Sequence, residues 1–72
     1  MIKELDSVVL TVDLPEHGLK KGDVGTVVLM HDGGGYEIEF MTLGGATLAV
    51  MTLTRDQVRA VGGREIAQAR VL

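Results

Sequence analysis

Apolar and polar residues alternate along much of this chain with the period of two that is typical of β-strands. The clearest case is YEIEF, in which Tyr36, Ile38 and Phe40 alternate with two glutamates. These three side chains are expected to face the core. Similar runs rich in β-branched and apolar residues predict further strands at 7–12, 24–30, 47–53 and 58–61. The pattern therefore predicts an all-β protein built from five short strands.

The segment 20–30, KKGDVGTVVLM, joins a predicted turn to the second strand, and the rest of the chain can be arranged around it. Gly22 can adopt the positive φ that a tight turn requires. Gly25 lies inside the strand, where a missing side chain allows another part of the protein to approach closely. We therefore expect this strand to lie in the middle of the sheet.

The connections between the strands have distinct compositions. Residues 13–22 contain a proline and two glycines among charged residues, which predicts a loop that folds back and buries Leu14 and Leu19 at its ends. Glycine-rich segments at 31–35 and 44–45 predict tight hairpin turns. The polar segment 54–57, which opens with threonine, predicts a single helical turn.

The chain changes character after Gly62 and Gly63. The final residues, REIAQARVL, are helix formers with apolar positions at a spacing of three, but so few residues make a marginal isolated helix. We therefore divide the chain into a small five-stranded SH3-like β-barrel at 1–61 and a C-terminal tail at 62–72. The tail is expected to form a short helix or to remain flexible.

Composition narrows the range of functions. The chain has 72 residues, which suits one domain, and a net charge of −3, which disfavours non-specific binding to nucleic acid. It has no cysteine, so disulfides, thiolate zinc sites and cysteine nucleophiles are excluded. No long apolar run indicates a membrane span, and the first residues lack the layout of a signal peptide. We therefore expect a cytoplasmic protein.

The segment DSVVLTVDLPEHGLKKGDVGTVV, together with YEIEF, LAVMTL and DQVRAV, resembles a family of small uncharacterised bacterial proteins. That family is known as a domain of unknown function, and the resemblance, which covers 1–61, implies an SH3-like barrel but no activity. Residues 21–28, KGDVGTVV, are also similar to the KOW motif of ribosomal and transcription-elongation proteins. This second similarity implies a nucleic-acid or ribosome-associated binding module. Lys20 and Lys21, which form the only basic pair of the chain, are the candidate contact residues for that alternative.

No group of residues in the sequence specifies a reaction. His17 and His31 have acidic neighbours but lie in separate loops, and neither has a nucleophile at a recognisable spacing. The glycines at 33–35 are not followed by the helix start that a phosphate-binding loop needs. We therefore expect no enzyme, catalytic residue, metal, cofactor or small-molecule substrate. Glu37 and Glu39 form an acidic pair, which is either a solvated face or a patch that meets a basic partner.

The chain carries more apolar residues than a barrel of this size can enclose. Large exposed apolar patches usually mark surfaces that bind partners, and methionine adapts well to such surfaces. The candidate partner-binding residues are Met41, Leu43, Met51, Leu53, Ile66 and Leu72. The expected function is a non-enzymatic protein–protein interaction module, either a homo-oligomer or an accessory or toxin-neutralising partner of a neighbouring gene product. The alternative is the KOW-like binding module.

Overall fold

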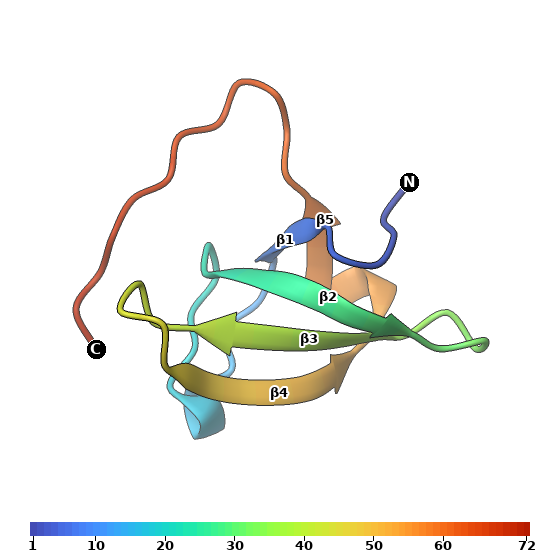
Figure 1. The fold of residues 1–72 in the computed structure, drawn as a ribbon, viewed down its shortest axis with the longest axis horizontal. Helices are drawn as coiled ribbons and strands as arrows, with labels where there is room; N and C mark the ends of the chain where they lie inside the picture. The colour runs from blue at the N-terminus through green and yellow to red at the C-terminus, as the bar shows by residue number, and fades with distance from the viewer.

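The computed structural model describes residues 1–72 and shows one antiparallel sheet of five strands in the order β4-β3-β2-β1-β5 (Figure 1). The all-β prediction is confirmed, and each predicted strand is present, although the first and last are shorter than expected. The strands are β1 (Ser7–Leu10), β2 (Val24–Met30), β3 (Tyr36–Met41), β4 (Thr47–Leu53) and β5 (Val58–Ala60). Two short 3₁₀ turns, η1 (Pro15–His17) and η2 (Arg55–Gln57), complete the secondary structure. None of these elements is a helix with the length and hydropathy needed to span a membrane.

The prediction of a closed barrel is wrong, because β4 and β5 lie at opposite ends of the strand order and do not pair. The turn η2 carries the chain from one edge of the sheet to the other. Leu53 at the end of β4 and Val58 at the start of β5 both join the same core cluster. The two edges therefore share the core through their side chains without closing the backbone hydrogen bonds.

The core lies on the face of the sheet that the alternation in β3 predicts. Tyr36, Ile38 and Phe40 are all buried, whereas the two glutamates between them are not. The core cluster consists of ten buried residues, namely Val8, Leu10, Leu14, Leu19, Val27, Tyr36, Ile38, Phe40, Leu53 and Val58. Gly25 of β2 is also buried and lies directly against Ile38 and Phe40. The close approach expected at this glycine is thus made by core side chains.

The connections have the form that their composition predicts. Leu14 and Leu19 bracket the loop between β1 and β2, pair with each other as an isolated bridge, and are both buried. Gly22 has a φ of 98°, which is the positive value expected in the turn before β2. Thr54 and Gln57 form a reciprocal capping box around η2. The turns thus hold the ends of the strands against the core.

Residues 62–72 contain no helix and no strand in the structure. A helix of this length would need a packing surface. Instead, the tail leaves β5, curves away from the sheet and comes back at the side of the sheet where β2 begins (Figure 1). Two ion pairs attach it to the rest of the protein, from Glu65 to Arg59 and from Arg70 to Asp23.

Candidate interaction surface

The face of β2, β3 and β4 that points away from the core combines exposed apolar side chains with two carboxylates. The strand register places Glu37 between Leu29 and Thr52, and Glu39 between Thr26 and Val50. Alternation along β3 puts Met41 on the same side as the two glutamates. We call this surface the outer sheet face and define it by Leu29, Glu37, Glu39, Met41, Val50 and Thr52.

An irregularity in β2 explains why Leu29 lies on this face. The register with β3 shifts between Val27 and Leu29, so Val28 is an extra residue in β2. Val27 is completely buried, but Leu29 is 47% exposed and lies beside Glu37. The uninterrupted apolar run at the end of β2 predicts a strand in which neither face is fully exposed to solvent. The structure instead exposes the last three residues of that run, Val28, Leu29 and Met30.

Hydrogen bonds hold both carboxylates of the outer sheet face toward β4. Glu37 accepts a bond from Thr52 Oγ1 at 2.9 Å, and Glu39 accepts one from Thr47 Oγ1 at 2.6 Å. The second carboxylate oxygen of Glu37 lies 3.7 Å from Nε2 of His31, which is the only basic side chain paired with either glutamate. The surface is therefore acidic, with apolar side chains on both sides of the carboxylates.

The structure does not gather the predicted partner-binding residues into one patch. Leu53 is only 4% exposed and belongs to the core, so its assignment to an exposed apolar surface is wrong. Met51 points to the inner side, opposite Ile38, and packs against the core while half-buried. The alternation of β4 decides both placements, because Tyr36 and Leu53 are also opposite each other on the inner side.

The other four predicted residues lie at three separate places. Met41 is on the outer sheet face and is 49% exposed. Leu43 is 92% exposed in the turn between β3 and β4. Ile66 and Leu72 are exposed on the tail. Neither residue belongs to the strands that form the outer sheet face. Leu29 and Val50 were not singled out from the sequence, because their exposure depends on the bulge and on which strand occupies the sheet edge.

The tail is attached through side chains that have no local signature in the sequence. Arg70 donates from Nε and Nη2 to the carboxylate of Asp23 at 2.7 and 2.6 Å, and Nη2 also donates to the carbonyl of Gly18 at 2.9 Å. Arg59 makes a similar two-point contact with Glu65, which also accepts the backbone N–H of Gly62. The first contact joins residues that are far apart along the chain, so pattern analysis could not predict it.

These contacts perturb both carboxyl groups in the same direction. The hydrogen bond from Arg70 is the main reason that the pKa of Asp23 is lowered, against the opposing effect of burial. The hydrogen bonds from Arg59 and from the backbone of Gly62 lower the pKa of Glu65 to about 2. Both shifts favour the ionised carboxylates, which is the form that pairs with the two arginines.

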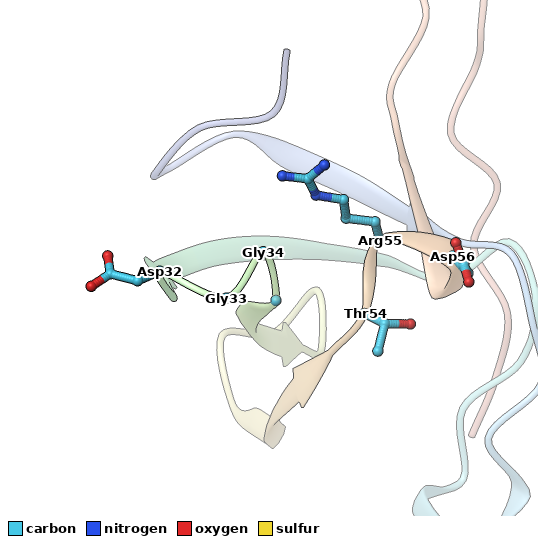
Figure 2. Close-up of a pocket in the computed structure, with 7 residues that line it drawn as sticks. Asp32, Gly33, Gly34, Thr54, Arg55 and Asp56 are labelled. Atoms are coloured by element: carbon cyan, nitrogen blue, oxygen red, sulfur yellow. The ribbon is translucent and has the colours of Figure 1, made fainter.

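A shallow polar hollow of about 420 Å³ lies between the β2–β3 turn and η2 (Figure 2). Its lining has no apolar residue and comes from 32–35 and 54–56. The Arg55 side chain extends across the glycine turn beside Gly34, while Asp56 points to the opposite side (Figure 2). No three His, Cys, Asp or Glu side chains gather anywhere in the structure as a metal site requires. The hollow thus offers one cation and two separate carboxylates.

The two lysines of the KOW-like segment lie among carboxylates. The backbone N–H groups of Lys20 and Lys21 donate to Asp23 and Asp13, both at 2.8 Å. Asp23 also binds Arg70, so this arginine lies near Lys20, and the carboxylate between them offsets part of their positive charge. Binding of nucleic acid through these lysines stays a prediction that no contact in the structure tests.

Comparison with known proteins identifies the family. Residues 4–60 match the family model described as Domain of unknown function (DUF4926). The chain belongs to this family. The matched region of DUF4926 runs from the segment before β1 to the end of β5, and the tail lies outside it. No curated protein and no solved structure gives a significant match. Membership confirms the resemblance to an uncharacterised family.

Proposed function

We propose that this protein is a non-enzymatic interaction module that binds another protein through the outer sheet face. The observation that carries the proposal is the exposure of Leu29, Met41 and Val50, each about half accessible, on the same face as two carboxylates. Isolated exposed apolar residues are common on soluble proteins, whereas larger apolar patches with polar residues around them usually mark interaction sites.

The chemistry of this face indicates the kind of partner. Glu37 and Glu39 carry negative charge between apolar neighbours, and only His31 lies near enough to pair with one of them. A partner segment that presents lysine or arginine together with apolar side chains would complement both features. Burial of the half-exposed apolar groups would supply the affinity, and the carboxylates would select the orientation.

The strand arrangement also supports an SH3-like fold for the matched region. The chain has five short antiparallel strands, a long loop between the first two, tight turns between the middle strands and a 3₁₀ turn before the last. We propose that the sheet is an open variant of that small barrel. Contacts between Leu53 and Val58 detected in solution by NMR would support this view, and their absence would refute it.

The test uses the full chain as bait in lysate treated with nuclease, with two variants matched in chemistry. Leu29→Asp changes the outer sheet face, and Val61→Asp changes a residue of similar exposure beyond β5. We expect Leu29→Asp to weaken binding of the captured protein by about tenfold or more and Val61→Asp to leave it unchanged. Glu39→Gln should weaken binding and reduce its dependence on salt.

Two outcomes would contradict the proposal. Equal binding by both aspartate variants would remove the outer sheet face from the interaction. Capture of material that is lost after nuclease treatment, and that is also lost in untreated lysate when Lys20 and Lys21 are changed to alanine, would favour the KOW-like module instead.

A further inference from the structure

Strand β4 forms a free edge of the sheet along its whole length. It is hydrogen-bonded to β3 on one side and ends the strand order on the other. None of the backbone hydrogen bonds outside the sheet involves residues 47–53. In an antiparallel sheet, alternate residues of an edge strand direct their N–H and C=O groups away from the neighbouring strand. β4 therefore presents a row of unpaired backbone donors and acceptors, and it borders the sheet in Figure 1.

β4 lacks the features that usually prevent an edge strand from pairing. Such features are charged side chains, proline, a very short strand or a bulge in its middle. β4 has seven residues, TLAVMTL, without charge or proline, and its single irregularity lies at Leu48 near its beginning. The other edge strand, β5, has three residues and carries Arg59. Only β4 is suited to accept another strand.

The sequence of β4 is complementary to itself in the antiparallel direction. If two copies align with Val50 opposite Val50, then Ala49 lies opposite Met51, so that a small side chain meets a large one. Leu48 then lies opposite Thr52, and no like charges face each other. The carboxylates of β3 in the two copies are separated by three strand spacings, roughly 14 Å. This distance exceeds the Debye length of about 8 Å at physiological ionic strength, so their repulsion is screened.

We propose that two copies of this chain associate through antiparallel pairing of β4 with β4, centred on Val50, to form one sheet that continues across both copies. This inference goes beyond the proposed function, because it requires no partner of different sequence. It leaves the outer sheet face accessible apart from Val50 and its neighbours on β4, and it places the two copies of that face side by side. The pairing gives hydrogen-bond partners to the free edge and excludes water from around the two Val50 side chains.

Sedimentation of the purified chain from micromolar to millimolar concentration tests the proposal. We expect the mass to rise toward that of two chains. Val50→Lys places two ammonium groups opposite each other and should raise the dissociation constant by about tenfold or more. Leu29→Lys is the control, because Leu29 has similar exposure on the same face but lies on a strand paired on both sides. A single-chain mass at millimolar concentration, or an equal effect of both variants, would overturn the proposal.

A cross-linking experiment tests the register. The chain has no cysteine, so Val50→Cys introduces a unique thiol. Directly opposed residues have Cβ atoms about 4.5–5.5 Å apart, close to the separation that a disulfide spans. We expect mild oxidation to convert this variant to a covalent dimer much faster than Leu29→Cys. Equal rates would refute the pairing of β4 with itself, and because both experiments use the purified chain, their failure would leave the proposed binding of another protein unaffected.

Discussion

Gly25 is the position at which one added methyl group should cost the most stability. It lies in β2, the middle strand of the sheet, and is buried. A Cβ atom there would lie 2.5 Å from Ile38 Cγ2 and 2.8 Å from Phe40 Cε1. Ile38 is fully buried and Phe40 is 2% exposed, so neither side chain can turn toward solvent to make room. Gly25→Ala must therefore displace the packed core or separate β2 from its neighbours.

The expected cost follows from overpacking in well-packed cores, which is about 1–3 kcal/mol. A domain of this size has a total stability of about 3–5 kcal/mol, so the substitution should remove a large part of it. For small domains, 1 kcal/mol corresponds to a shift of roughly 4–8 °C in Tm. Gly25→Ala should accordingly lower Tm by roughly 5–20 °C.

Thermal and urea unfolding followed by far-UV circular dichroism measure this change directly. Gly33→Ala is the matched control, because Gly33 has no positive φ and a Cβ there meets no atom within 4 Å. The control should leave stability unchanged or raise it slightly. Equal stability of Gly25→Ala and the wild-type chain would show that the core around Ile38 and Phe40 is looser than the structure indicates, and would refute this reasoning.

Three further predictions concern the turns and the tail. Leu5 is 79% exposed and has a φ of 71°, a backbone conformation that is costly for leucine but not for glycine. Leu5→Gly should therefore raise the free energy of unfolding by about 0.5–1 kcal/mol in urea titrations, whereas the control Glu4→Gly should not. Gln57 Oε1 accepts a hydrogen bond from the backbone N–H of Thr54 at 2.9 Å. Gln57→Ala should therefore lower the free energy of unfolding by about 0.5–1 kcal/mol in the same assay. A similar loss in Asp56→Ala would argue against the capping box. The pKa of Asp23 is lowered from 3.8, and the pKa of Glu65 is lowered from 4.5 to about 2. Attachment of the tail should therefore be complete above about pH 4.5 and lost as the pH falls toward 2. NMR of the tail amides measures this loss, and Arg70→Gln should release the last residues at neutral pH; a tail that is equally ordered in both forms would contradict the prediction.

The extent to which the sequence predicts this fold differs between local and long-range features. The alternation in Tyr36–Met41 fixes the inner and outer sides of β3, and through the register those of β2 and β4. The turn before β2 and the capping of η2 follow from glycine and threonine chemistry, which acts within a few residues. These features could be predicted because each depends on neighbours along the chain.

The incorrect and missing predictions depend on contacts between distant residues. Whether β4 and β5 pair is decided by how strongly the sheet curves, which period-two alternation does not encode. The burial of Leu53 depends on its position opposite Tyr36, and the exposure of Leu29 depends on a bulge one residue earlier. The extended tail depends on Arg70 reaching Asp23 across the molecule. The acidic pair and Met41 of the candidate surface could therefore be predicted from the sequence, whereas Leu29 and Val50 could not.

The strand order also leads us to expect a particular sequence of events during folding. β2, β3 and β4 follow one another along the chain and are joined by short turns, so their pairing closes only small loops. β1 pairs with β5, which is about 50 residues away along the chain, and this step carries the largest loop-closure entropy. The central hairpins are thus the natural nucleus, and the docking of β5 beside β1 completes folding late. Substitutions at Val58 should consequently accelerate unfolding while leaving the folding rate almost unchanged.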